Sequence, residues 1–449
     1  MRTKSICPEC EKVIPAEIDK REDGVFLVKE CEKHGKFEEK FWGDADSYDR
    51  YMRYSAEGYK ADTTTNCPND CGLCAEHVTQ QPFFCFLNLT SRCNANCPTC
   101  FQKDFPEPTF EELRKMFKAV LNAGCSSILY TGGEPTVRKD LVEVVKLARE
   151  CGIRHQKLST NGILLAEKPG LARELKESGL GIVLLSFDSL DDEIYKKMKG
   201  QPLLETKKRA LENCRRAGLE VVLIPTVMKG VNDSQLGAIL DFAARNSDIV
   251  KMVDFQAMFF EGRYPKVERI TAPEIVEKIA EQTPFRKEFF YPLTFGDTFA
   301  QLAEYKRGKR LRRFAEHPLC TAFSAFYSDK GRIVPFNEFI DLARMEKEIR
   351  LFLDSPTRLN YARFAYRVLK AIDWRKKPRG FKLFKLLRTF HKIPLQFRLG
   401  ENAIVVSVLN FMDRYTLDTN RLKGCTTPYI LPSGKLVPFC AYNVLRDHY

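Results

Sequence analysis

The chain has 449 residues, 44% of them hydrophobic and 29% charged, and a formal net charge of +13. This length and composition are typical of a soluble globular protein with about three domains. No segment reaches the ~18 consecutive apolar residues of a membrane span. The N-terminus lacks the apolar stretch of a secretory signal, so we expect a cytoplasmic protein.

The sixteen cysteines are concentrated near the N-terminus, ten of them between residues 7 and 100. Disulfides are rare in cytosolic proteins. The C-x2-C and C-x3-C-x2-C spacings of these cysteines are typical of metal sites instead. The first quarter of the chain is therefore predicted to hold several metal centres.

Residues 1–60 are predicted to form a small metal-binding ribbon. Cys7 and Cys10, followed by Cys31 and His34, form two knuckles around an apolar strand-like run. Two such knuckles suit a tetrahedral zinc or a rubredoxin-like mononuclear iron. A module this small also needs a metal to be stable. His34 is the one ligand that a cysteine from elsewhere in the chain could replace.

Residues 61–82 carry a first C-x3-C-x2-C motif, formed by Cys67, Cys71 and Cys74. It lies in a polar stretch without a preceding strand, and its spacing favours an auxiliary four-iron cluster. Cys85 follows shortly after, either as a fourth ligand or as a buried residue of the next strand.

Residues 83–263 alternate apolar strand-like runs with amphipathic helical stretches. Repeated βα units of about 30 residues predict a parallel sheet with right-handed crossovers. Neither a dinucleotide-binding glycine motif nor a P-loop is present. Six units favour an α/β fold with a partial (β/α)6 barrel. The predicted strands are 83–89, 127–130, 157–159, 182–187, 221–226 and 252–258, and the helices include 109–123, 141–150 and 204–217.

Polar residues follow each predicted strand, at the end where parallel barrels carry their functional side chains. Six such ends in register predict a single site on one rim. In strand order the residues are Cys93, Cys97 and Cys100; Thr131 to Pro135; Ser159 to Gly162; Ser186 to Ser189; Pro225 and Thr226; and Gln256 with Glu261 to Arg263.

The second C-x3-C-x2-C motif, Cys93, Cys97 and Cys100, directly follows the first barrel strand. Thiolates are the preferred ligands of iron–sulfur clusters. Three of them hold three irons of a four-iron cluster and leave the fourth iron open to another molecule. The alternative is a structural metal knot completed by a distant cysteine.

This motif, followed by the aromatic Phe101 and by Gly-Gly-Glu-Pro about 30 residues later, resembles the radical SAM superfamily. The resemblance implies that the open iron chelates S-adenosylmethionine and that the reduced cluster releases a 5′-deoxyadenosyl radical, which abstracts hydrogen from an unactivated C–H bond. It also implies which side chains lie near this cofactor. Phe101, directly after Cys100 in the sequence, is one of them. Gly132, Gly133 and Glu134 would face the methionine amino group. Asn161, Ser186 and Asp188 would lie near the sulfonium or ribose.

A wider set of motifs, from the N-terminal Cys-Pro-x-Cys to the C-terminal Pro-Phe-Cys-x-Tyr-Asn, looks like the archaeal tetraether lipid synthase family. Members join two lipid hydrocarbon chains by a C–C bond, and some carry the name of methyltransferases acting on a pterin precursor. Lipid cross-linking is thus the expected activity, with methylation of a small heterocycle as the alternative. An iron–sulfur electron-transfer or RNA-binding protein is a second alternative. The resemblance further implies several four-iron clusters and a rubredoxin-like metal. An enzyme of this kind needs an electron donor such as ferredoxin or flavodoxin.

Residues 264–449 are predicted to form a C-terminal substrate and auxiliary-cluster domain. Cys320, Cys425 and Cys440 are far apart in sequence but suit a second auxiliary cluster with an unassigned fourth ligand. Their alternative role is that of small buried hydrophobic residues. The remaining three cysteines are predicted to pack in the barrel: Cys125, Cys151 and Cys214.

Most of the positive charge lies in residues 358–398, which hold thirteen Lys and Arg against a single acid, Asp373. Apolar residues recur every third position from Phe381 to Phe390, roughly one helical face. A basic amphipathic helix suits an anionic membrane surface, and we expect peripheral contact with the inner face of the membrane. A solvated face packed on the core is the main alternative, and nucleic acid is the less favoured partner.

Overall fold

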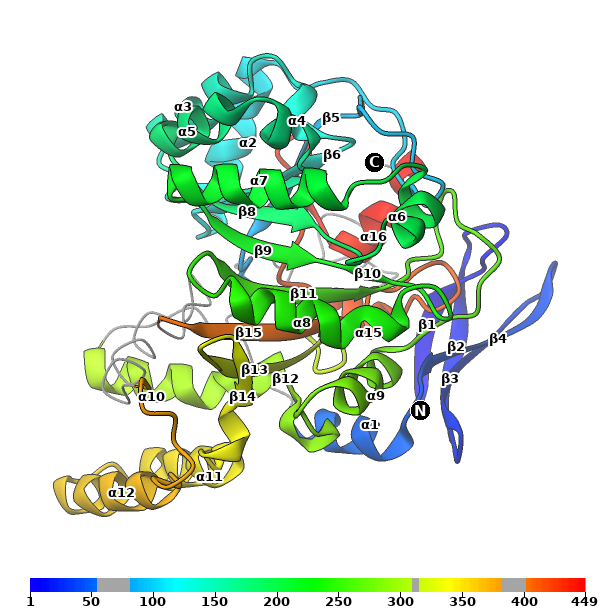
Figure 1. Cartoon of the computed structure of the whole chain (residues 1–449). Helices are drawn as coiled ribbons and strands as arrows, with labels where there is room; N and C mark the ends of the chain where they lie inside the picture. The colour runs from blue at the N-terminus through cyan, green and yellow to red at the C-terminus, as the bar shows by residue number, and fades with distance from the viewer. Residues whose placement is uncertain (55–80, 309–314, 382–400, 449) are drawn as a thin grey trace.

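Six parallel strands form the centre of the protein (Figure 1). The computed structural model describes residues 1–54, 81–308, 315–381 and 401–448. Each of the six predicted strands is present, and each pairs in parallel with the next along the chain. The strands are β5 (Cys85–Thr90), β6 (Ser127–Gly132), β7 (His155–Thr160), β8 (Leu180–Ser186), β9 (Glu220–Ile224) and β11 (Val250–Ala257). The α/β fold with a partial (β/α)6 barrel is confirmed.

Helices cover the outer face of these strands. They are α2 (Phe110–Asn122), α3 (Leu141–Glu150), α4 (Ile163–Glu167), α5 (Pro169–Ser178), α6 (Asp192–Lys199), α7 (Leu204–Ala217), α8 (Leu236–Arg245) and α9 (Ala272–Gln282). Helix α2 shows why they form. A capping box between Thr109 and Glu112 satisfies its first amides, and Leu113, Met116 and Val120 recur at helical spacing on its buried face.

The residues after the barrel extend the same sheet at both of its edges. β15 (Ala403–Leu409) lies parallel to β11, and β13 (Thr321–Asp329) lies antiparallel to β15. At the other edge β16 (Tyr429–Ile430) pairs in parallel with β5. The remaining short strands are β10 (Thr226–Val227), β12 (Tyr291–Pro292), β14 (Arg332–Pro335) and β17 (Leu436–Val437). The C-terminal third therefore closes the edges that a six-stranded sheet would leave unpaired.

The N-terminal residues form a second, antiparallel sheet. Its strands follow one another in the order β1 (Arg2–Ile6), β2 (Val13–Arg21), β3 (Gly24–Cys31) and β4 (Gly35–Trp42), and α1 (Ala45–Met52) comes next in the chain. Figure 1 shows this sheet, in dark blue, beside the end of the large sheet at which the strand arrowheads point. The ribbon thus stands next to the predicted functional rim.

A smaller core lies under α10 (Asp297–Arg307), α11 (Leu342–Asp354) and α12 (Arg358–Lys370). The basic amphipathic helix predicted around Trp374–Phe390 is described only up to Phe381, where the chain forms turns; its remainder lies outside the described residues. Two short helices, α15 (Thr419–Lys423) and α16 (Phe439–Val444), complete the elements used below. No helix of the described chain is long and apolar enough to cross a membrane.

Candidate active site and metal centres

The loop with Cys93, Cys97 and Cys100 lies at the carboxyl end of β5, as the sequence predicts. Its backbone is fixed from two sides. The Arg263 amide donates to the Cys100 carbonyl at 2.8 Å, and the Thr99 hydroxyl donates to the Met198 carbonyl at 3.2 Å. The loop is therefore held between the chain after β11 and the end of α6.

Burial raises the pKa of the Cys93 and Cys97 thiols. The Glu134 carboxylate and the other two thiols of the motif raise the pKa of Cys93 further, whereas Lys199 lowers that of Cys97. Neighbouring thiols become good ligands once a cationic centre offsets the charge of their thiolates. This donor set fits a thiolate-ligated iron–sulfur cluster.

Gly132 and Gly133 carry the chain directly against the start of the cysteine loop. A Cβ on Gly132 would lie 2.2 Å from the Thr90 carbonyl oxygen, and its φ of +137° disfavours any side chain. A Cβ on Gly133 would lie 2.5 Å from the carbonyl oxygens of Ser91 and Arg92. Only glycine fits this contact, so β6 and the cysteine loop share one rigid rim.

The Glu134 carboxylate is buried and ties two strand ends together. Its Oε1 accepts from the hydroxyls of Thr136 and Thr160, at 2.6 and 2.7 Å, and its Oε2 accepts from the Asn161 amide at 2.6 Å. The Asn161 side chain in turn donates to Asn94, inside the cysteine motif, at 2.8 Å. The predicted cofactor residues after β6 and β7 thus contact the cluster loop.

Ser186 ends β8 and Asp188 follows it on the same rim. Each lies beside a lysine that the sequence analysis did not predict as a site residue. Lys207 Nζ donates to the Asn161 carbonyl at 2.6 Å and to the Ser186 hydroxyl at 3.2 Å. Lys199 Nζ lies 3.2 Å from an oxygen of the fully buried Asp188. The two ammonium groups place positive charge on the rim beside Asp188, Ser186 and Asn161.

The buried Lys207 ammonium makes the stability of the fold depend on pH. Burial lowers the pKa of Lys207 from 10.5 to about 8, so between these values the unfolded chain binds a proton that the folded chain does not. Stability therefore rises with pH in this window. Relative to Lys207→Met, the wild type is expected to gain up to ~3 kcal/mol in free energy of unfolding between pH 8 and 10.5. Anaerobic urea titrations of both proteins measure this, and parallel pH profiles would contradict it.

Phe101 packs against the chain that follows β11. Its ring meets the ring of Phe259 edge to face, with centroids 5.4 Å apart. The following residues contact the end of the chain, where Arg446 donates to the Gln102 side chain at 3.0 Å and Lys103 pairs with Asp447 at 2.6 Å. The C-terminal residues therefore cover the segment after the cluster motif, which the sequence did not indicate.

The four predicted ribbon ligands converge. Their ligand atoms all lie within 4.8 Å of one another, with Cys7 Sγ 3.4 Å and Cys31 Sγ 3.5 Å from His34 Nδ1. Cys10 and Cys31 bring their sulfurs to 3.9 Å. Amide hydrogen bonding at Lys33 lowers the pKa of Cys31 to about 6, which favours the thiolate that a metal requires. Three sulfurs and one imidazole nitrogen suit a closed tetrahedral site.

Replacing Cys10 with serine is expected to remove one metal ion per chain and to destabilise the ribbon, because its small core depends on the metal. Cys10 is exposed, so the substitution leaves no cavity. Elemental analysis and thermal unfolding measure the two effects. Cys151→Ser, a change at a partly buried cysteine of the barrel, is the control and should retain the metal. An unchanged metal content in Cys10→Ser would show that the ion lies elsewhere.

The structure also gathers Cys320, Cys425 and Cys440, which come from three separate segments. All three line one cavity inside the barrel, together with Arg421 and Glu316. Burial raises the pKa of each thiol, to about 11 for Cys320 and about 12 for Cys440. The three cysteines predicted to share a cluster are therefore neighbours.

The remaining cysteines divide into two groups. Cys67, Cys71 and Cys74 lie outside the described residues, so the first auxiliary cluster and the role of Cys85 in it stay predictions. Cys85 is fully buried on β5 in the main hydrophobic core. Cys125, Cys151 and Cys214 pack in or against the same core.

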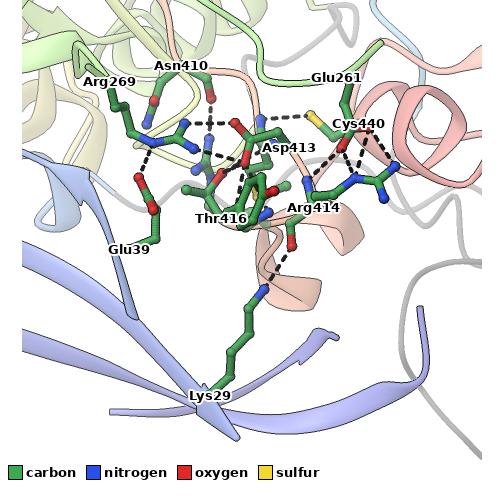
Figure 2. Close-up of polar contacts among 12 residues, drawn as sticks. Lys29, Glu39, Glu261, Arg269, Asn410, Asp413, Arg414, Thr416 and Cys440 are labelled. Atoms are coloured by element: carbon green, nitrogen blue, oxygen red, sulfur yellow. Dashed lines mark hydrogen bonds and ion pairs between the residues drawn. The ribbon is translucent and has the colours of Figure 1, made fainter. Parts of the chain in front are cut away.

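A polar network joins the ribbon to the rim (Figure 2). Arg269 donates to Glu39 of the ribbon and to both oxygens of Asp413, at 2.6, 2.8 and 3.1 Å. Lys29 donates to the Arg414 carbonyl at 2.8 Å. Arg414 itself pairs with Glu261 at 2.8 Å and reaches the Pro8 carbonyl, between two ribbon ligands, at 3.2 Å.

This network connects the metal sites through short segments of chain. Glu261 is two residues before Arg263, which holds Cys100. On the other side, the amide of Met412, next to Asp413, donates to Cys440 Sγ at 3.4 Å. The loop at Met412–Arg414 thus contacts the ribbon, Cys440 and the segment from Glu261 to Arg263, which in turn bonds Cys100.

Comparison with known proteins agrees with this geometry. The profile of the radical SAM superfamily matches residues 87–243, and that of the HMPTM N-terminal zinc ribbon domain matches residues 1–43. The 7,8-dihydro-6-hydroxymethylpterin dimethyltransferase of Methanocaldococcus jannaschii is 32% identical over 99% of this chain and 94% of its own length. A probable GTP 3′,8-cyclase of Pyrococcus abyssi is 31% identical over 51% of this chain and 68% of its own.

Solved structures with similar folds include SuiB of Streptococcus suis bound to S-adenosylmethionine, with 14% identity, a TM-score of 0.39, and coverage of 59% of this chain and 67% of that one. The resemblance to the radical SAM superfamily is confirmed by the matching profile and by the full-length relative. The chain therefore belongs to the radical SAM superfamily and to the family of the Methanocaldococcus jannaschii protein, with a zinc ribbon and a radical SAM barrel in one polypeptide.

Proposed function

We propose that this radical SAM enzyme transfers methyl groups to a reduced pterin precursor such as 7,8-dihydro-6-hydroxymethylpterin. The observation that carries the proposal is the full-length similarity to the dimethyltransferase, which extends through the ribbon, the barrel and the C-terminal third. The main expectation from the sequence was lipid cross-linking. The comparisons favour methylation of the heterocycle over it.

The chain's own residues would serve the cofactor as follows. Cys93, Cys97 and Cys100 would hold a four-iron cluster which, with S-adenosylmethionine bound, supplies a radical strong enough to break an unactivated C–H bond. Lys199 and Lys207 supply positive charge suited to the cofactor's carboxylate.

Lipid cross-linking remains a second candidate because of the barrel interior. The cavity inside the barrel is lined mainly by apolar side chains, most of them from the strands, which suit a hydrocarbon better than a polar ring. They include Phe84, Phe86, Ile182, Leu184, Val222, Met252, Val405 and Leu409.

We also propose that the enzyme is cytoplasmic and makes peripheral contact with an anionic membrane surface. Tyr361, Tyr366 and Leu369 are exposed along α12, and Trp374 is exposed just after it, within the basic segment. Exposed aromatic side chains beside Lys and Arg suit the boundary between headgroups and acyl chains. Reduction of the radical-site cluster would come from a small electron carrier such as ferredoxin or flavodoxin.

The two candidate reactions are separated by one incubation. Reduced, cluster-loaded protein is mixed with S-adenosylmethionine and either the dihydropterin or an archaeal membrane lipid extract, and products are identified by mass spectrometry. Methylated pterin together with 5′-deoxyadenosine supports the proposal. Lipids of doubled mass would support cross-linking instead. Salt-sensitive RNA binding without any cleavage of S-adenosylmethionine would refute both enzymatic readings.

A further inference from the structure

The cavity inside the barrel holds an unusual set of polar groups. Its walls are mostly apolar, yet Cys320, Cys425 and Cys440 line it together with Glu316 and Arg421. Its volume, measured for the centre of a water molecule, is about 180 Å³. By the same measure a single water needs only ~10–15 Å³. The space is therefore large enough for a group much bigger than a single water.

Two of these groups each have one buried atom without a hydrogen-bond partner, although Glu316 also bonds Thr321 and Arg421 also donates to two carbonyls. Glu316 Oε1 is buried and accepts no hydrogen bond, and Arg421 Nε is buried and donates none. Leaving a buried hydrogen-bonding atom without a partner is costly, so natural folds rarely leave one. Both atoms point to a missing neighbour that is a Lewis acid for the carboxylate and an anion for the guanidinium.

The surroundings of Arg421 specify the charge of that neighbour. The side chain is 2% exposed, and its Nη2 donates to the carbonyls of Asn410 and Leu319, at 2.6 and 3.4 Å. It also lies 3.7 Å from Cys320 Sγ. Within the described parts of the chain, no carboxylate is in ion-pair contact with it. A group carrying net negative charge at the three sulfurs would balance this cation.

An iron–sulfur cluster ligated by thiolates meets both requirements. Its irons are Lewis acids, and its sulfides and thiolates give the whole group a negative charge. We propose that Glu316 is the fourth protein ligand of a four-iron cluster held by Cys320, Cys425 and Cys440, with Arg421 as its counter-charge. This centre does not depend on which substrate the enzyme takes.

Glu316 is better placed for this role than its neighbour His317. The His317 Nδ1 already accepts the Leu319 amide at 3.3 Å, and the residue is absent from the cavity wall. Glu316 lines the cavity and has a free oxygen. A carboxylate at one corner leaves one iron more weakly held than the three bound by cysteine.

The proposal can be tested by measuring how fast this weakly held iron is lost on oxidation. The full chain is prepared with alanine at Cys67, Cys71, Cys74, Cys93, Cys97 and Cys100, so that only the proposed cluster can assemble. Iron and sulfide are then counted, and circular dichroism checks the fold. On treatment with ferricyanide, the oxidant takes one electron, one ferrous ion leaves, and a three-iron cluster remains that electron paramagnetic resonance detects.

Glu316→Gln is expected to lose this iron at least ~10-fold faster than the parent, and Glu316→Cys more slowly than the parent. Glu111→Gln, on the exposed face of α2, should behave like the parent. Arg421→Gln should lower the reduction potential, since a cation near the cluster favours the reduced state.

Equal rates of iron loss in the parent and Glu316→Gln would overturn the role of Glu316. If Cys425→Ala with Cys440→Ala removed no iron, the cluster itself would be refuted. Should the multiply substituted background fail to fold, the same two cysteine changes in the otherwise wild-type chain should remove about four irons by Mössbauer spectroscopy. None of these readouts uses enzymatic activity, so they stand apart from the test of the proposed function.

Discussion

Replacing Cys97 with alanine is expected to abolish the formation of 5′-deoxyadenosine from S-adenosylmethionine. Cys97 is the middle ligand of the rim motif, and its backbone is held in a loop fixed by Arg263 and Met198. Changes to residues that only support a metal ligand typically cost 10–100-fold. Loss of the ligand itself should exceed that and leave product at the level of a reaction without enzyme.

The measurement is chromatographic quantification of 5′-deoxyadenosine after reduction with dithionite. Cys151→Ala is the matched control, since Cys151 ends α3 and only packs against the core; it should keep at least about half of the wild-type rate. The ribbon ligands of Cys97→Ala should still bind their metal. Product formation by Cys97→Ala within twofold of the wild type would show that the radical is generated at another cluster.

The barrel strands were predictable because each is a short apolar run that ends in polar residues. β5 illustrates this, with Cys85, Leu87 and Leu89 buried against the helices on one face and Phe86 turned into the cavity on the other. The placement of β13 and β15 was not predictable in the same way. Neither strand was among the predicted elements, and their pairing at the β11 edge depends on contacts between residues that are far apart in sequence.

The rim lysines show a second limit. Lys207 lies on α7, whose sequence is rich in charged residues, and a lysine in such a helix is normally solvated. Only the position of α7 against the ends of β7 and β8 buries this one at 0% exposure. A sequence pattern can reveal which face of a helix is apolar, but not that a polar side chain is buried by another element.

The site of the C-terminal cysteines could be predicted only in part. The local context of Cys320, Cys425 and Cys440 suggested a shared site, but spacing alone could not bring them together. The structure does so by pairing β16 with β5 and β13 with β15. Glu316 and Arg421 were not predicted, because a single charge near a cysteine has no periodicity that would mark it as buried.

Removing the Asp413 carboxylate is expected to have the largest effect on stability. Asp413 is 1% exposed and accepts from both terminal nitrogens of Arg269, from the amides of Tyr415 and Thr416, and from the Thr416 hydroxyl. In Asp413→Ala the mostly buried Arg269 guanidinium keeps the Phe260 ring beside it, but among the described residues Glu39 is then its one ion-pair partner. Breaking a buried pair on one side typically costs 3–5 kcal/mol.

The free energies of unfolding of three variants, measured by urea denaturation, separate the effect of the unpaired charge from that of lost packing. Asp413→Ala should lose about 3–5 kcal/mol, whereas Glu281→Ala, which breaks an exposed pair with Lys278, should lose at most about 0.5 kcal/mol. Adding Arg269→Leu to Asp413→Ala should recover part of the loss, because no buried cation remains unpaired. A loss in Asp413→Ala no larger than in Glu281→Ala would mean that the loop at Met412–Arg414 does not join the ribbon to the barrel.

Arg414 in that loop also pairs with Glu261, two residues before Arg263, whose amide bonds the Cys100 carbonyl. Asp413→Ala should therefore also lower the iron content at the cluster of Cys93, Cys97 and Cys100.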